Sequence, residues 1–158
     1  MERVPITKGG HEALREEMRR LKAVERPKIS KEIGVAREHG DLSENAEYHA
    51  AKEKQGLIEA RIAYLEDRLA RAEVIDPSSL SGDRVVFGAT VRLLDVDNDL
   101  EVTYRIVGED ESDLDRGLIS IASPIARALI GKLVDDEVEI RTPRGSRHYE
   151  ILEVSYED

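Results

Sequence analysis

The 158-residue chain lacks cysteine and tryptophan, and only 4% of its residues are aromatic. Without cysteine there is no disulfide and no thiolate metal site, which is compatible with a reducing compartment. The scarcity of aromatic residues argues against one large aromatic core. The N-terminal segment MERVPITKGG lacks the apolar core of a signal peptide, and no apolar run approaches membrane-spanning length. We therefore expect a cytoplasmic protein that does not engage a membrane.

Charged residues are abundant, at 37% of the chain, and the two signs are unevenly distributed. Residues 1–76 carry 15 basic and 16 acidic side chains, whereas residues 77–158 carry 9 and 18. Because the second part would be repelled by nucleic acid, free DNA is a poor candidate ligand. The high charge content fits long helices with solvated faces.

Helical periodicity dominates residues 1–76. From residue 48 to residue 72 the seam positions recur at alternating steps of three and four, which is typical of a heptad seam. In the preceding helical segment the step from Leu21 to Ile29 is one residue too long, and Pro27 lies in that gap. This spacing predicts a kink or local unwinding near Pro27.

A short break at residues 39–43 separates the two helical patterns. So short a connection predicts two antiparallel neighbours of about 30 residues each, or roughly 45 Å at the usual rise per residue. Thr7 is a candidate N-cap of the first helix, because its hydroxyl can accept a hydrogen bond from an unpaired backbone amide.

The segment IDPSSLSGD, residues 75–83, has the composition of a linker. After it the pattern changes to strands separated by turn signals, and one short helix is expected at residues 123–132. The expected strands are 84–94, 100–108, 117–123, 136–142 and 147–156. The predicted fold class is α+β, with an antiparallel coiled-coil domain at 1–76 and a domain with an antiparallel sheet and one short helix at 77–158.

Two carboxylates stand out at the break between the helices, whose expected tip is residues 39–45. Asp41 and Glu44 are three residues apart, so on a helix their Cβ atoms would lie about 5–6 Å apart. One interpretation is a capping box, with Asp41 at the N-cap and Glu44 at N3. The other is half of a Mg²⁺ site, because Mg²⁺ prefers oxygen ligands and the remaining ligands could come from a partner or a phosphate. The sequence leaves both open.

The basic residues near the tip and the apolar residues of SPIARALIG can each be interpreted structurally or functionally. Arg37 and Lys52 flank the tip, either as parts of an ordinary solvated face or as a small basic spot that steers a nucleic-acid end. Within SPIARALIG most apolar side chains should pack on the sheet, and any that stay exposed would form a partner patch.

Four separated stretches of the chain resemble the GreA branch of the Gre family of bacterial transcript cleavage factors. They are AREHGDLSENAEYHAAKE, VIDPSSLSGDRVVFGATV, TYRIVGEDE and LISIASPIARALIGK, in that order along the chain. The resemblance runs essentially end to end, and the tip shows no departure from the family pattern.

The resemblance implies a coiled coil followed by a domain of FK506-binding-protein-like fold, with RNA polymerase as the partner. It implies that the second domain docks at the rim of the polymerase secondary channel and that the hairpin enters the channel. Asp41 and Glu44 would then help to hold a second Mg²⁺ beside the polymerase's own aspartates. Backtracked RNA would be cut at its 3′ end, with the polymerase as the enzyme and this chain, expected to be a monomer, as its activator. No cofactor is expected to bind stably to the chain alone.

The resemblance also implies further residue roles. Arg37 and Lys52 would lie near the RNA 3′ segment, and the region containing Ser123, Pro124, Ile125 and Leu129 would contribute to docking. A non-cleaving regulator that only occupies the channel is the alternative function. A prolyl isomerase, suggested by fold alone, and a free-standing nuclease are disfavoured, because neither has a supporting constellation of residues.

Overall fold

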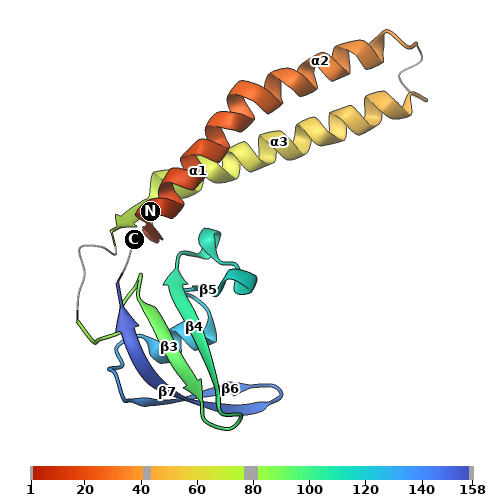
Figure 1. Ribbon diagram of the computed structural model, residues 1–158. Helices are drawn as coiled ribbons and strands as arrows, with labels where there is room; N and C mark the ends of the chain where they lie inside the picture. Colours follow the sequence, from red (N-terminus) through yellow and green to blue (C-terminus); the bar gives the residue numbers. More distant parts are fainter. Residues whose placement is uncertain (1, 41–43, 77–81, 157–158) are drawn as a thin grey trace. The chain divides into compact units, whose positions relative to one another are not determined.

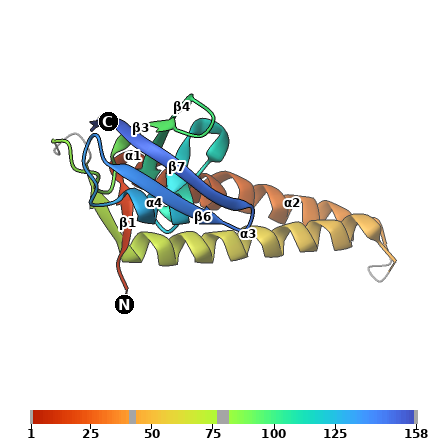
Figure 2. The same ribbon diagram turned by 90° about the horizontal axis from the view of Figure 1, so that it is seen from below.

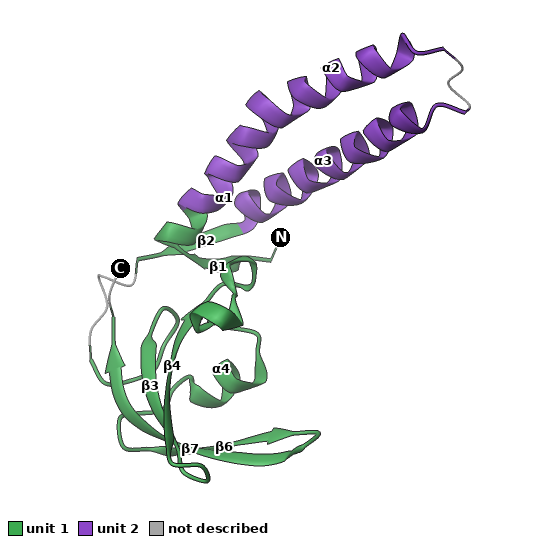
Figure 3. Ribbon diagram, turned by 45° about the vertical axis from the view of Figure 1, so that its right-hand side comes forward, with its two compact units in different colours: residues 1–11, 72–158 green, residues 12–71 purple. Residues whose placement is uncertain are grey.

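The computed structural model describes residues 2–40, 44–76 and 82–156, which form two compact units. Residues 12–71 make one unit, and residues 1–11 with 72–158 make the other (Figure 3). We call them the hairpin unit and the sheet unit. The predicted α+β class, with an N-terminal helical hairpin and a C-terminal sheet domain, is confirmed. No described helix has both the length and the apolar character needed to span a bilayer.

The hairpin unit is built from two antiparallel helical arms, which run side by side in Figures 1 and 2. The first arm is interrupted and the second is a continuous helix. The elements are α1 (Lys8–Arg20), the π-helix η1 (Leu21–Glu25), α2 (Arg26–Arg37) and α3 (Ala46–Arg71).

The π-helix η1 explains the irregular spacing of the first arm. It ends directly before the α2 segment that carries Pro27 in its first turn, and the Arg26 amide donates to the Leu21 carbonyl five residues earlier. A π turn takes up the one extra residue between Leu21 and Ile29. Pro27 has no amide to donate and is tolerated at a helix start. The predicted local unwinding near Pro27 is confirmed.

A single apolar seam joins the two arms. The buried side chains recur at the predicted heptad positions, and Leu21 and Tyr48 pack against them half-buried. The buried members of this cluster are Ile29, Ile33, Ala51, Ile58 and Ile62. All five lie on one face of each helix, as period-3.6 patterning requires.

The sheet unit contains a five-stranded sheet in the order β5-β4-β3-β7-β6. Neighbours are antiparallel except for β4 and β5, which are parallel. The strands are β3 (Thr90–Asp95), β4 (Leu100–Val107), β5 (Leu118–Ser120), β6 (Glu137–Thr142) and β7 (Gly145–Ser155). Helix α4 (Pro124–Leu129) packs with β5 and β6. Its Ser123 N-cap and first-position Pro124 confirm the expected helix start.

A second, two-stranded sheet accounts for the N-terminal residues of the sheet unit. Strand β1 (Val4–Thr7) pairs in parallel with β2 (Ala72–Ile75), so the residues before and after the hairpin arms are joined. The sequence interpretation assigned both segments to the helical domain. By contacts the structure groups them with residues 82–156, while the proposed domain division after residue 76 stays a prediction.

Candidate functional site at the hairpin tip

The tip lies where α2 ends and α3 begins. Helix α2 ends at Arg37, and Gly40 adopts a φ of +106°, a left-handed conformation that glycine reaches without a Cβ penalty. Helix α3 begins at Ala46, and Glu44 is exposed just before it. Asp41 lies outside the described residues, so the geometry of its pairing with Glu44 stays a prediction.

Asn45 ties the two helix ends together. Its side-chain oxygen accepts from the Tyr48 amide at 3.0 Å, which makes Asn45 the N-cap of α3. Its amide nitrogen donates to the Ala36 carbonyl at 2.7 Å, in the last turn of α2. One side chain therefore satisfies an unpaired donor at the start of one helix and an acceptor near the end of the other.

The position of Asn45 corrects the capping interpretation of Glu44. A capping box needs Glu44 at N3, but Glu44 precedes the N-cap, and Tyr48 occupies N3. Within the described part of the chain, no hydrogen bond or ion pair engages the Glu44 carboxylate. The side chain is therefore available for an external ligand. Asparagine is among the strongest N-cap residues, so the residue before Ala46 was a signal that the sequence interpretation overlooked.

One histidine and two acids lie close together at the tip. The His39 ring lies 4.0 Å from the Glu47 carboxylate, and a shallow hollow involves both residues together with Glu44 and Asn45. Over residues 2–40, 44–76 and 82–156, no group of three or more histidine or acidic side chains could hold a metal ion. Two carboxylates alone would supply only part of the six ligands that Mg²⁺ takes.

The basic residues beside the tip have partners of their own. The Arg37 guanidinium lies 5.9 Å from the centre of the Tyr48 ring, within cation–π range. Tyr48 in turn meets His49 edge-on, with 5.6 Å between the ring centres. The Lys52 ammonium donates to Gln55 at 3.1 Å. Both cations are exposed, and each would have to give up only one weak intramolecular contact to bind an external anion.

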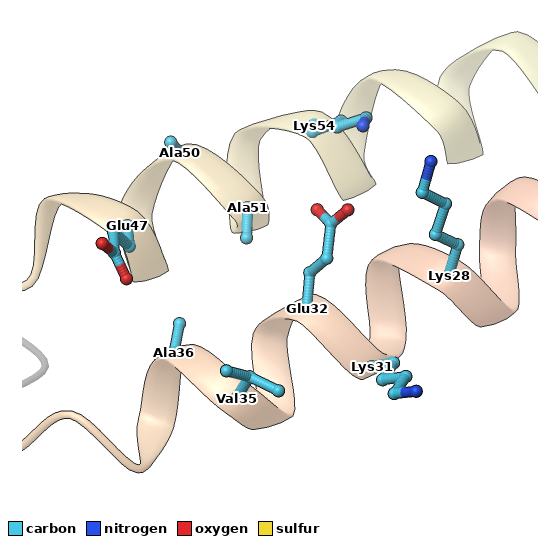
Figure 4. Close-up of a pocket in the computed structure, with 9 residues that line it drawn as sticks. All are labelled: Lys28, Lys31, Glu32, Val35, Ala36, Glu47, Ala50, Ala51 and Lys54. Carbon is cyan, nitrogen blue, oxygen red and sulfur yellow. The ribbon is translucent and has the colours of Figure 1, made fainter.

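A groove of about 610 Å³ runs between α2 and α3 below the tip (Figure 4). Its floor consists of small or apolar side chains, including Val35, Ala36 and Ala51. The Glu32 carboxylate and the Lys28 ammonium are directed toward α3. Small side chains line the groove on both helices, so it stays open beside the seam that Ile33 and Ala51 form.

The predicted partner-binding segment divides into exposed and buried parts. Ser123 caps α4 by accepting from the Ala126 amide at 3.3 Å, Pro124 is exposed and Ile125 is half-buried. Leu129 has no exposed surface and belongs to the sheet core. The prediction that Leu129 contacts a partner is therefore wrong for this conformation, because its side chain is used in packing α4 on the sheet.

A second groove, of about 440 Å³, lies beside the edge strand β5. Ser123 and Ile125 line it together with residues of the turn before β5. That turn contains the 3₁₀ helix η4 (Leu114–Arg116), whose Leu114 is 75% exposed. Asp113 and Asp115 also line the groove, so this surface combines apolar side chains with two acidic ones.

Known proteins resemble this chain over nearly its full length. A family model described as the N-terminal part of a transcription elongation factor matches residues 4–74, and one for the GreA/GreB C-terminal part matches residues 80–156. Transcription elongation factor GreA of Hyphomonas neptunium is 61% identical over 156 residues, covering 99% of both chains. The protein of that name from Anaeromyxobacter sp. is 63% identical, covering 99% of this chain and 94% of its own.

Among solved structures, GreA factor homolog 1 (Gfh1) of Thermus thermophilus is 31% identical, with a TM-score of 0.45. The match covers 97% of this chain and 99% of that one. The two family models together cover the hairpin and the sheet, and the relatives match from end to end. The chain belongs to the GreA/GreB family of transcription elongation factors.

Proposed function

We propose that this protein binds RNA polymerase through its sheet unit, inserts the hairpin into the secondary channel and stimulates cleavage of backtracked RNA. The chain is an activator in this scheme, and the polymerase supplies the nuclease centre. Family membership supports the polymerase as partner. The length of the hairpin supports insertion, because α3 alone has 26 residues, or about 39 Å at the usual helical rise.

The observation that carries the proposal is the state of Glu44. Its carboxylate is exposed at the tip, and Asn45 performs the capping that would otherwise occupy it. Because the Glu44 carboxylate does not cap a helix, its oxygens remain available to a cation that arrives with the partner. Asp41, three residues earlier, is proposed as its companion.

A hard cation fits this donor chemistry. Carboxylate oxygens are the ligands that Mg²⁺ prefers, and a partly hydrated ion needs only one or two of them from each side. When bound, Mg²⁺ would lower the pKa of a water and stabilise charge on the transferred phosphate. The task of this chain is to hold Asp41 and Glu44 at the end of a stiff rod, where they meet the polymerase's own carboxylates.

The basic residues give the tip a second task. Arg37 and Lys52 are proposed to contact phosphates of the RNA 3′ segment and to position it without reading its bases. Both are exposed and held only by a cation–π contact and a side-chain hydrogen bond. If each side chain left its present contact and bound a phosphate, it would form a charge-assisted hydrogen bond.

Cleavage by a stalled, backtracked polymerase complex tests the proposal. We expect the double variant Asp41→Asn with Glu44→Gln to bind polymerase as the parent does but to lose most stimulation of cleavage. Glu38→Gln with Glu53→Gln removes two neighbouring exposed acids and is the charge-matched control. If the Asp41/Glu44 variant cuts as fast as the parent while bound, the metal role is wrong. If the parent binds without stimulating cleavage, the protein is a channel-occupying regulator.

A further inference from the structure

Glu111 forms an unusual set of contacts inside the sheet unit. It ends the short 3₁₀ helix η3 (Glu109–Glu111), and its carboxylate accepts hydrogen bonds from the Thr7 amide at 3.0 Å and the Gly108 amide at 2.8 Å. The Thr7 hydroxyl donates to the same carboxylate. Thr7 lies 104 residues earlier in the sequence and is 3% exposed. Three donors on one carboxylate is near the limit of what the group can accept.

Thr7 is also the N-cap of α1. Its hydroxyl oxygen accepts from the Gly10 amide at 3.1 Å, as the sequence predicted. In a capping box, the glutamate at N3 accepts from the N-cap amide. Here N3 is Gly10, which has no side chain, and Glu111 supplies the carboxylate from a distant loop.

The two glycines around this contact leave the room that it needs. A Cβ at Gly10 would collide with the Glu111 carboxylate, and one at Gly108 would lie 2.6 Å from the Pro5 carbonyl oxygen. A Cβ at the neighbouring Gly9 would have nothing within 4 Å. The sequence therefore places a weak helix former where the carboxylate approaches, although alanine is intrinsically better in a helix.

The contact joins two segments that have different tasks in the proposed function. Helix α1 begins in the sheet unit and continues into the hairpin unit, which starts at Glu12. The residue after Glu111, Ser112, is the first to line the groove beside β5 that also includes Ser123 and Ile125. One carboxylate thus holds the root of the first hairpin arm next to the surface proposed for docking.

We propose that Glu111 is a positioning residue for cleavage stimulation, which fixes the root of α1 to the loop of residues 109–112 beside the proposed docking groove, so that a docked factor holds its tip acids in place. The inference rests on the proposed function. If the root were loose, docking would still occur, but the acids at the far end of the rod would sample many positions. Misplacement by about 1 Å is enough to lower a rate by up to a hundredfold.

A matched pair of glycine variants tests the inference in the backtracked complex. Gly10→Ala displaces the Glu111 carboxylate, whereas Gly9→Ala changes the same helical turn and leaves the contact alone. We expect Gly10→Ala to lower the cleavage rate at saturating factor about tenfold, with little change in the half-saturating concentration. Gly9→Ala should match the parent in both. A purely structural role would lower the melting temperature of Gly10→Ala without changing the saturated rate, measured well below melting.

Changing the carboxylate itself gives an independent check. Glu111→Gln keeps one acceptor oxygen but can no longer serve all three donors, so its saturated rate should lie between those of the parent and Glu111→Ala. Glu137→Ala removes an exposed acid of β6 as the control. Equal saturated rates for the parent, Gly10→Ala and Glu111→Ala would overturn the inference while leaving the proposed function intact. A parent that does not stimulate cleavage would remove the proposed function itself.

Discussion

The hairpin unit and the sheet unit are stabilised in different ways. The sheet unit has a core cluster in which Leu93, Ile106 and Ile151 have no exposed surface. The hairpin has one seam between two helices, where Ile29 is 1% exposed and Ile33 and Ile58 are 6% and 8% exposed, and its buried cluster has fewer members than the sheet core. A hairpin of two helices can bury only one face of each helix, so it buries less apolar surface per residue than a compact domain.

Exposed ion pairs connect the two arms at the sides of the seam. Arg26 meets Glu59 at 2.8 Å through two parallel hydrogen bonds, and Lys22 meets Glu66 at 2.9 Å. Both pairs connect the first arm to the second, and both are exposed. Such pairs fix the alignment of the arms more than they add stability. The sheet unit is therefore specified by its core and the hairpin by its periodicity.

The largest effect on stability is expected in the sheet core. Ile151→Ala leaves a cavity at a site with no exposed surface, which typically costs about 2–5 kcal/mol. Hydrogen exchange read by mass spectrometry should show loss of protection across β3, β4 and β7. Residues 29–62 of the hairpin should keep theirs, because their seam shares no side chain with the core cluster. Equal loss of protection in both units would mean that they unfold as one.

A seam substitution should cost less than the same change in the core. Ile33→Ala removes the same atoms as Ile151→Ala, but the two helices can close toward each other and solvent lies nearby, so we expect about 2 kcal/mol, the low end of the range. Protection should fall in α2 and α3 and remain in the sheet strands. Val35→Ala, at a 48% exposed position of the same helix, is the matched control. A cost above that of Ile151→Ala would reverse the comparison.

The same contrast explains what the sequence could predict. Heptad spacing depends on neighbours three and four residues apart, so the hairpin and the irregularity at Pro27 followed from local pattern. Alternation and turn residues placed β4 and β6 within one residue at each end. The contact of Thr7 with Glu111 could not be predicted this way, because it joins residues 104 positions apart through a side chain.

At the hairpin tip the sequence predicted the break between the helices, while the roles of Asp41 and Glu44 stay predictions. One of the two interpretations left open by the sequence put the N-cap at Asp41, whereas the structure has Asn45, four residues later, as the N-cap of α3. Several N-cap residue types follow one another here, and propensity alone cannot choose among them. Leu129 was misjudged for a related reason: a helix as short as α4 shows too few turns for its periodicity to separate buried from exposed positions.

A smaller effect is expected where the hairpin is joined at its tip. Asn45→Ala removes both the α3 cap and the bond to Ala36, and loss of a cap costs about 1 kcal/mol. Asn45→Asp keeps the accepting oxygen but cannot donate to the carbonyl, so it should fall between the parent and alanine. The rate of amide hydrogen exchange in residues 46–50 should rise from the parent to Asn45→Asp to Asn45→Ala. Glu53→Ala is the control. If the amides of the Asn45→Asp variant exchange as fast as those of Asn45→Ala, the hydrogen bond to the Ala36 carbonyl of α2 stabilises the tip more than the cap does.

The smallest effect should come from the ion pair on the side of the hairpin. The hydrogen bond from Arg26 lowers the pKa of the Glu59 carboxyl below its ordinary 4.5. Because the folded state holds the charged form, the pair contributes fully above 4.5 and its contribution is lost as the pH falls through the lowered value. Glu59→Gln should therefore melt slightly below the parent at neutral pH, and the difference should shrink in acid. Helical circular dichroism during melting measures it. A melting difference that persists at a pH where the Glu59 carboxyl is protonated would assign the effect to side-chain packing, and the Arg26–Glu59 pair would then have no measurable part in aligning the arms.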